Sequence, residues 1–251
     1  MKLNKNKILN LILILIPFVC VLIVWQIGSL FTNEFILPSV GETFSALLAI
    51  IFQGSFYSSL LGTLLRTLIA FTSSFVVAFL LAFWSRISER AEVMISPIIS
   101  FLRALPTIAV VLLLLLWTNS FIAPIVVTSL VVLPTTYSSL KESFFSVDKD
   151  LIQALKLFNV DNKTLLNKVY IPSVLPSTLL TVGTGLSLNL KLMVAAEVIA
   201  ATANSLGYML NSSKVNFAMA KMIAIVVITV VIGLIVEAVF KLVSKKVGCW
   251  Q

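Results

Sequence analysis

The chain has 251 residues, of which 59% are hydrophobic and 11% are charged, and its mean hydropathy is +1.10. About a quarter of the residues in an ordinary globular domain are charged, so this composition excludes a soluble domain and indicates an integral membrane protein. The sequence contains no histidine. This excludes His-based catalytic triads, haem ligation by histidine and the common His-containing zinc sites. We therefore expect no catalytic residue, no metal site and no cofactor.

Apolar stretches long enough to cross a bilayer follow one another along the chain. The first follows the basic peptide MKLNKNK, but it is long for a signal peptide and no small-residue cleavage site follows, so we expect it to be retained. The third contains a kink at Pro106. The expected fold class is an all-α integral membrane protein whose single transmembrane domain, 1–251, has about six spans at 8–30, 58–84, 92–117, 122–140, 177–200 and 217–243.

The basic residues are distributed unevenly among the loops between these stretches. Thirteen of the 18 Lys and Arg residues fall on the side that holds both termini, whereas Lys214 and Lys221 fall on the other side. Short cytoplasmic loops carry an excess of Lys and Arg. The bias places both termini and the loop 148–176 in the cytoplasm, and it accounts for the net charge of +8 without a nucleic-acid partner.

The loop 148–176 is the longest polar-rich interval and reads as two short amphipathic helices. Asp148 or Asp150 can cap the first helix, and Asn159 falls where that helix should stop. Asp161 can cap a second helix over 162–170, which we expect to end at Pro172. The pattern alone fits either a docking segment or an ordinary cytoplasmic loop. The first helix has one apolar face, formed by Leu151, Ile152, Leu155 and Phe158.

The same segment resembles the cytoplasmic EAA loop of ABC importer permeases. The pattern falls on Gln153, Ala154, Leu155, Asn159, Val169, Ile171 and Pro172, with Gln153 in place of the usual glutamate and Asn159 in place of a glycine. Asparagine, like glycine, tolerates positive φ. In the family this loop is a coupling helix that docks on the ATP-hydrolysing subunit. The resemblance implies docking residues Leu151, Gln153, Ala154, Leu155, Lys156, Phe158, Asn159 and Pro172.

Four further stretches extend the resemblance over roughly 35–243: FILPSVGETFSAL, SLLGTLLRTLIAF, SPIISFLRALPTIAVVLLLLLW, and MVAAEVIA followed by LGYML. Together they are similar to permeases of the nitrate/sulfonate/taurine group of ABC importers. The resemblance implies a type I importer permease fold in the bacterial plasma (inner) membrane. It also implies a second permease copy, two ABC ATP-binding subunits and an extracytoplasmic solute-binding protein or lipoprotein as partners. The chain has no G-x-x-x-x-G-K-[ST] phosphate loop, so ATP hydrolysis would belong to a partner subunit.

Polar residues inside the spans are candidates for the translocation path. Lys191 lies near the middle of the fifth span, where a lysine costs about 2.5–3.5 kcal/mol on insertion scales. It could attract an anionic solute, or it could pair structurally with a carboxylate such as Glu237. Arg66 and Arg103 lie near span ends, where both could snorkel to the headgroups; Arg103, just before the kink at Pro106, could instead form a structural bond to the kinked backbone. The path candidates are Thr181, Asn189, Lys191, Glu197 and Arg103.

The sequence leaves the identity of the transported solute open. Lys191 and the family group favour a small anion such as nitrate, a sulfonate or taurine, while related permeases also move thiamine precursors and other small organic molecules. A secondary transporter that works alone is an alternative of another class, although the sequence shows no convincing internal repeat.

Overall fold

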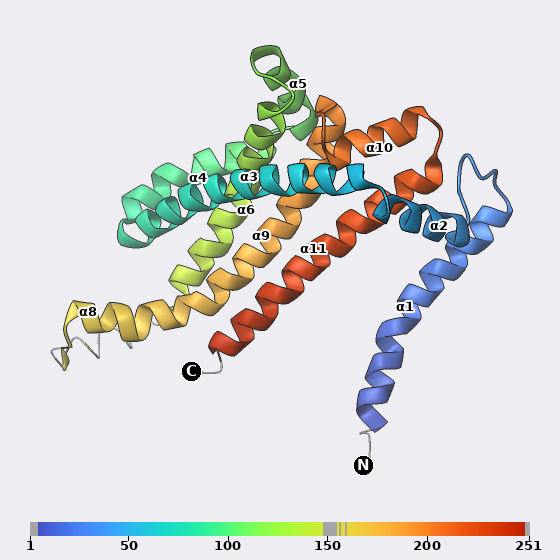
Figure 1. Ribbon diagram of the computed structural model, residues 1–251. Coiled ribbons are helices and arrows are strands. Elements are labelled where there is room, and N and C mark those ends of the chain that lie inside the picture. Colours follow the sequence, from blue (N-terminus) through green and yellow to red (C-terminus); the bar gives the residue numbers. More distant parts are fainter. Residues whose placement is uncertain (1–4, 148–154, 156, 159, 249–251) are drawn as a thin grey trace. The chain divides into compact units, whose positions relative to one another are not determined.

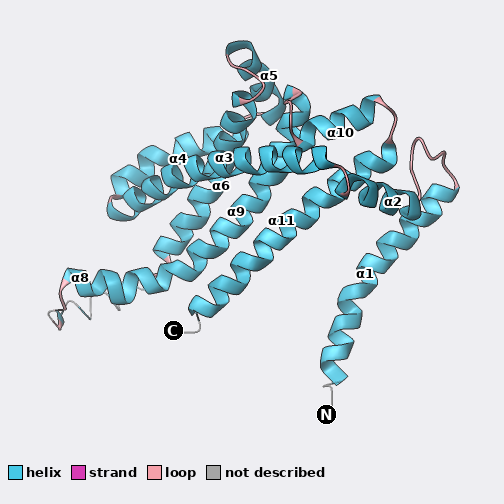
Figure 2. Ribbon diagram, viewed as in Figure 1, coloured by secondary structure: helices cyan, strands magenta, loops and turns pink. Residues whose placement is uncertain are grey.

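The computed structural model describes residues 5–147, 155, 157–158 and 160–248, and the secondary structure of these residues is helical without a strand (Figures 1 and 2). The all-α prediction is confirmed for this part of the chain. The helices are α1 Lys5–Leu30, α2 Val40–Ile51, α3 Gly54–Ile87, α4 Glu89–Ala104, α5 Thr107–Trp117, α6 Ile122–Phe145, α8 Asn162–Leu165, the π-helix η1 Leu166–Tyr170, α9 Ile171–Ala200, α10 Leu206–Val215 and α11 Met219–Gly248.

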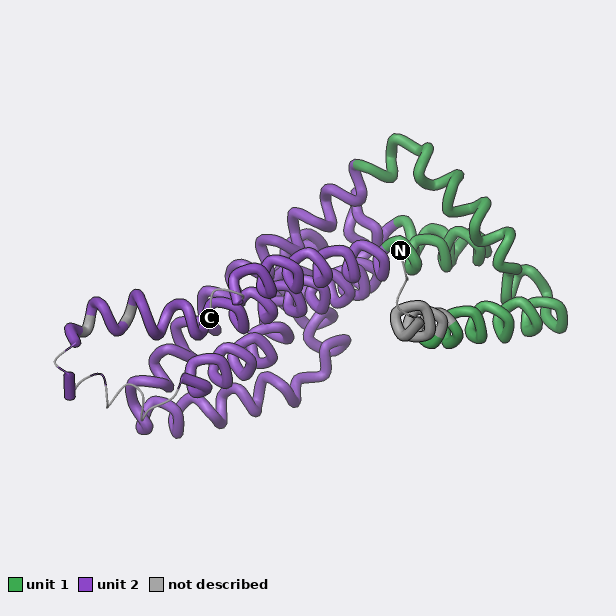
Figure 3. Tube along the Cα trace, turned by 90° about the horizontal axis from the view of Figure 1, so that it is seen from below, with its two compact units in different colours: residues 1–57, 209–228 green, residues 58–208, 229–251 purple. Residues whose placement is uncertain are grey.

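The chain forms two compact units (Figure 3). One contains residues 1–57 and 209–228, and the other contains residues 58–208 and 229–251. In the first unit the connector after α1 folds back on that helix, because the Trp25 indole donates to the Pro38 carbonyl at 3.0 Å. Ser39 and Glu42 then form a capping box that starts α2 at Val40.

The second unit has its core where α3, α4, α6 and α9 meet. Small residues on α3 allow close approach, which is typical of membrane helices. Hydrogen bonds between α3 and α6 add to this packing: Ser74 donates to the Ser129 carbonyl at 3.1 Å, and the hydroxyls of Ser85 and Tyr137 lie 2.8 Å apart. The buried core residues are Ala78, Ala82, Ala91, Ile95, Ile99, Tyr137, Leu140, Phe144, Val147 and Val174.

The third expected span is broken rather than kinked. Its two halves, α4 and α5, are bent by 91° at the break. Leu105 is extended, with φ −65° and ψ 125°, because a residue that precedes proline avoids the helical region. Pro106 then supplies no N–H to continue the ladder. The sequence placed the irregularity at the right residue, and the kink that it predicted is a break between two helices.

Four helical segments in the described part of the chain are long and apolar enough to cross a membrane, and the bent α4–α5 pair would make a fifth. The described apolar part of α1, Ile16–Leu30, is shorter than a full span. The four segments are Gly54–Ile87, Ile122–Phe145, Lys163–Ala200 and Met219–Gly248.

The second helix of the polar loop does not end at Pro172, contrary to expectation. Helical structure continues from α8 through the π-helical turn η1 into α9, and Pro172 lies at the start of α9. Proline fits the first turn of a helix because its missing N–H would be unsatisfied there. The wider i→i+5 turn just before it relieves the clash between the proline ring and the preceding turn.

Candidate functional site

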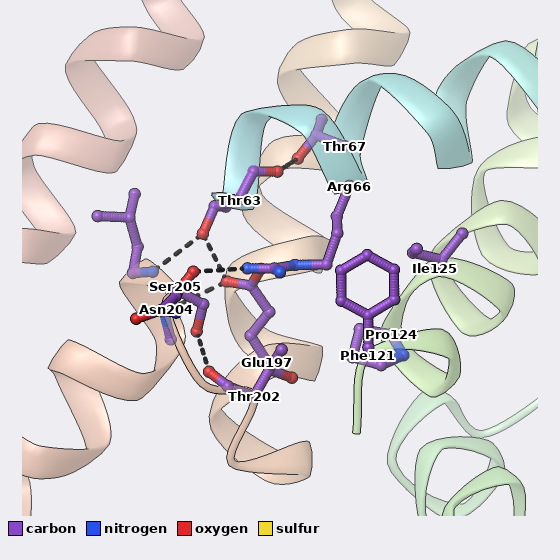
Figure 4. Close-up of polar contacts among 12 residues, drawn as sticks. Thr63, Arg66, Thr67, Phe121, Pro124, Ile125, Glu197, Thr202, Asn204 and Ser205 are labelled. Atoms are coloured by element: carbon purple, nitrogen blue, oxygen red, sulfur yellow. Dashed lines mark hydrogen bonds and ion pairs between the residues drawn. The ribbon is translucent and has the colours of Figure 1, made fainter. Parts of the chain in front are cut away.

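A buried ion pair joins α3 to the end of α9 (Figure 4). The Glu197 side chain is 0% exposed, and the Arg66 Nε donates to its Oε1 at 2.8 Å. Thr63, one turn before Arg66, donates its hydroxyl to Oε2 at 2.8 Å. The backbone N–H of Gly207 donates to the same oxygen at 3.3 Å. The carboxylate therefore has partners for both oxygens, as a charge in an apolar environment requires.

Arg66 does not snorkel to the headgroups, so that expectation is wrong. Arg66 is only 3% exposed. Its Nη2 donates to the Asn204 carbonyl at 3.0 Å, and its guanidinium lies 5.3 Å from the centroid of the Phe121 ring. The physical reason is that Glu197 supplies the opposite charge inside the protein. The guanidinium therefore gains no free energy by extending to water at the membrane surface. Two oppositely charged residues within spans were visible in the sequence, but their pairing was not.

The cluster also fixes the turn between α9 and α10. Ala201 and Asn204 have positive φ, 47° and 49°, so the chain reverses sharply after α9. Thr63 accepts the Leu206 N–H at 2.9 Å. At Gly207 any side chain would collide, because an added Cβ would lie 2.4 Å from the Cβ of Glu197. Contacts with Thr63 of α3 and Glu197 of α9 thus hold this turn in one conformation.

Two of the expected path residues on α9 face protein. Asn189 is fully buried, and its amide donates to the Thr67 carbonyl of α3 at 2.9 Å. Thr181 is buried and donates to the Ser177 carbonyl of its own helix. Thr181 also borders a notch of about 80 Å³ between α6 and α9 that is lined by hydroxyl groups, including those of Thr136 and Ser139. The side-chain oxygen of Thr136 is buried there without a hydrogen-bond partner.

Lys191 is exposed on α9. Its side chain passes close to α11, since its Cε lies 3.7 Å from the position that a Cβ on Gly233 would take. The alternative of a structural pairing with Glu237 is not seen, because the ion pairs within the described residues are Arg66–Glu197 and Lys141–Glu92. Lys191 is therefore an exposed charge on the surface of α9.

Arg103, near the end of α4, contacts α6. Its guanidinium donates to the Pro134 carbonyl at 3.4 Å and to the Ser138 hydroxyl. It lines a pocket of about 400 Å³ between the two helices. The Lys141–Glu92 ion pair, with 2.5 Å between Nζ and Oε1, lies in the same pocket. Arg103 is thus hydrogen-bonded to α6 while it remains exposed, and its snorkelling to the headgroups stays a prediction.

Most of the predicted docking residues lie outside the described residues: Leu151, Gln153, Ala154, Lys156 and Asn159. Of the others, Leu155 is helical and half-buried, and Phe158 is 82% exposed. The predicted cap at Asp161 is present, because Asp161 accepts the Thr164 N–H at 3.1 Å. Hydrogen bonds from the Thr164 side chain and backbone hold the pKa of Asp161 below its ordinary value.

These features define a class before any family is considered. The chain is a multi-pass helical membrane protein with a buried Arg66–Glu197 ion pair and with polar side chains along α9. Residues 74–248 match the family model described as "Binding-protein-dependent transport system inner membrane component". This match covers well over half of the chain, and the chain belongs to that family.

Individual relatives agree with the family. A probable ABC transporter permease protein of Brucella abortus (strain 2308) is 27% identical over 169 residues, which are 67% of this chain and 66% of the relative. A putative aliphatic sulfonates transport permease protein of Bacillus subtilis (strain 168) is 24% identical over 165 residues, 65% of this chain and 59% of the relative. The matched stretch thus spans 66% of the first relative's length and 59% of the second's.

Two solved structures have the same fold. The crystal structure of an amino acid ABC transporter with histidines superposes with a TM-score of 0.67 at 19% identity, covering 80% of this chain and 97% of that one. An inward-facing methionine ABC transporter superposes with a TM-score of 0.65 at 16% identity, and the match covers 75% of this chain and 94% of that one. The predicted importer-permease fold is therefore confirmed.

Proposed function

We propose that this chain forms the translocation path of an ATP-driven importer in the bacterial inner membrane, as one of two identical permease copies. Two separate ATP-binding subunits would hydrolyse ATP, and an extracytoplasmic binding protein would deliver the solute. The observation that carries the proposal is the family match over 74–248, which runs from α3 to α11 and includes the polar loop. The excess of basic residues on one side puts that loop in the cytoplasm, where a docking segment is needed.

The proposed solute is a small anion, such as a sulfonate, nitrate or taurine. Two observations support this class. One relative is named as an aliphatic sulfonates permease, and Lys191 places an exposed positive charge on an apolar helix. A positive charge along an apolar-walled path raises the local concentration of anions. A thiamine-precursor-like or other small organic solute is the alternative.

The first experiment isolates the tagged chain from its native membrane in mild detergent and identifies co-purifying proteins by mass spectrometry. A stoichiometric ATP-binding subunit and a solute-binding protein support the proposal. Uptake by the chain alone in liposomes, driven by an ion gradient without ATP, refutes it in favour of a secondary transporter. The class of solute is then tested by comparing the ATP-dependent uptake of a sulfonate with that of a neutral compound of similar size.

The docking role of the polar loop has its own test. Leu155→Asp places a charge where a half-buried leucine now lies, and we expect ATP hydrolysis by the assembled complex to continue while uptake falls at least about tenfold. Leu157→Asp, at a neighbouring position outside the predicted docking set, is the matched control. Normal uptake by well-expressed Leu155→Asp protein counts against docking at this loop.

A further inference from the structure

An apolar groove of about 580 Å³ lies in the second unit, where the end of α3 and the end of α6 meet the start of α9. Its volume is in the range of pockets that bind small organic molecules. Polar groups are few in its wall: Arg86, the Tyr170 hydroxyl and Thr178. The rest of the wall is apolar and largely aromatic, and includes Phe79, Phe83, Phe144, Val174 and Leu175.

Arg86 is held in a fixed position at one end of this groove. Its Nε donates to the Phe144 carbonyl at 3.1 Å. The guanidinium also lies over two aromatic rings, 5.4 Å from the centroid of Phe145 and 5.9 Å from that of Tyr170. Cation–π contacts of this length restrain an arginine without neutralising it.

The charge of Arg86 has no carboxylate partner within 4.0 Å among the described residues, where the ion pairs join Arg66 to Glu197 and Lys141 to Glu92. A half-buried, immobilised cation beside an apolar groove costs desolvation free energy unless an anion pairs with it. The guanidinium fork matches a phosphate group in charge and geometry.

The depth of the groove identifies the rest of the ligand. Arg86 lies in the last turn of α3, a candidate spanning helix, and basic residues at the ends of such helices reach the level of the lipid headgroups. Phe79 is seven residues earlier, which places the other end of the groove about 10 Å deeper along the helix. Tyr170, beside Arg86, is the kind of aromatic residue that is enriched at membrane interfaces. The charged end of the groove therefore faces the membrane interface, and its apolar wall extends toward the hydrocarbon core.

We propose that this groove is a binding site for one anionic phospholipid, with its phosphate on Arg86 and an acyl chain between α3 and α9. A zwitterionic lipid with the same chains fills the groove equally well but carries no net negative charge for Arg86. The positive-inside bias puts Arg86 on the cytoplasmic side, and anionic lipids are attractive partners for basic residues at that leaflet. The binding site is separate from the path residues and does not depend on which solute is carried.

The test titrates the full chain, purified in detergent, with palmitoyl-oleoyl phosphatidylglycerol or with phosphatidylcholine of the same chains. Bound lipid is counted by native mass spectrometry. We expect phosphatidylglycerol to bind about fivefold more tightly, the effect of roughly one basic residue at an anionic headgroup. Arg86→Gln should abolish this preference, whereas Arg90→Gln, an exposed arginine at the start of α4, should keep it.

A second variant protects the test against misfolding of Arg86→Gln. Leu175→Trp, at a wall position that is 39% exposed, fills the groove and should weaken binding of both lipids while leaving Arg86 in place. Equal binding of the two lipids by the unaltered chain overturns the proposal. So does a preference that survives Arg86→Gln, or lipid binding that disappears when the ATP-binding subunit is present, since a protein would then occupy the groove.

Discussion

Removing the charge of Glu197 should destabilise the fold far more than removing any other carboxylate that the structure describes in an ion pair. In Glu197→Gln the shape of the side chain is retained, and the hydrogen bonds from Thr63 and Gly207 can still form. Arg66, at 3% exposure, is left buried without a counter-charge. Breaking a buried pair from one side typically costs about 3–5 kcal/mol.

The double variant separates the ion pair from its surroundings. Arg66→Met alone leaves Glu197 buried and charged, which again costs about 3–5 kcal/mol. Without coupling, the two changes together would cost about 6–10 kcal/mol. In Arg66→Met/Glu197→Gln neither charge is present, and the remaining loss is chiefly the unpaired Asn204 carbonyl, about 1–3 kcal/mol. We therefore expect the double variant to be more stable than either single variant.

The free energy of unfolding is measured by reversible SDS titration in mixed micelles, followed by tryptophan fluorescence. Glu92→Gln is the matched control, because Glu92 pairs with Lys141 at side-chain exposures of 33% and 30%, where an ion pair contributes about 0–1 kcal/mol. If Glu197→Gln costs no more than Glu92→Gln, or if the double variant costs the sum of the single variants, the cluster is not a buried ion pair.

Two further predictions concern close packing and charge. Gly207→Ala should cost about 1–3 kcal/mol of unfolding free energy, because its Cβ would lie 2.4 Å from that of Glu197, whereas Gly41→Ala, with no atom within 4 Å, should be neutral or stabilising in the same titration. Lys191→Gln should slow ATP-dependent uptake of an anionic solute severalfold and weaken its dependence on salt, while uptake of a neutral solute is unchanged. Lys214→Gln is the control for this charge, and an equal effect of the two variants would contradict a path role for Lys191.

The helices were largely predictable from the sequence because each depends on a contiguous apolar stretch. α2 depends on equally local signals, because its capping box lies within four consecutive positions. The break at Pro106 was likewise marked by a residue whose effect is local. The size of the bend was not predictable, because a proline removes a hydrogen bond without dictating the direction in which the next helix packs.

The main site could not be predicted, because its two charges are 131 residues apart in sequence. Arg66 alone is compatible with snorkelling, and Glu197 alone is compatible with several partners. Which of them meets the other depends on how α3 and α9 pack, and one sequence does not contain that information. Pro172 was misjudged for a related reason: proline ends a helix that precedes it only if the preceding turn cannot widen, and here η1 does widen.

The two ends of α9 are held by different kinds of contact, and this difference bears on how the subunit moves. At the Ala200 end, Arg66, Thr63 and the 201–207 turn hold Glu197 through directional hydrogen bonds that have one good geometry. At the Tyr170 end the helix begins with a π-helical turn and borders an apolar groove. Apolar contacts slide more easily than a buried ion pair, which has to break. We therefore expect a displacement that begins in the polar loop to carry α9, α3 and the start of α10 together as one rigid body, with the adjustment taken up near residues 166–170.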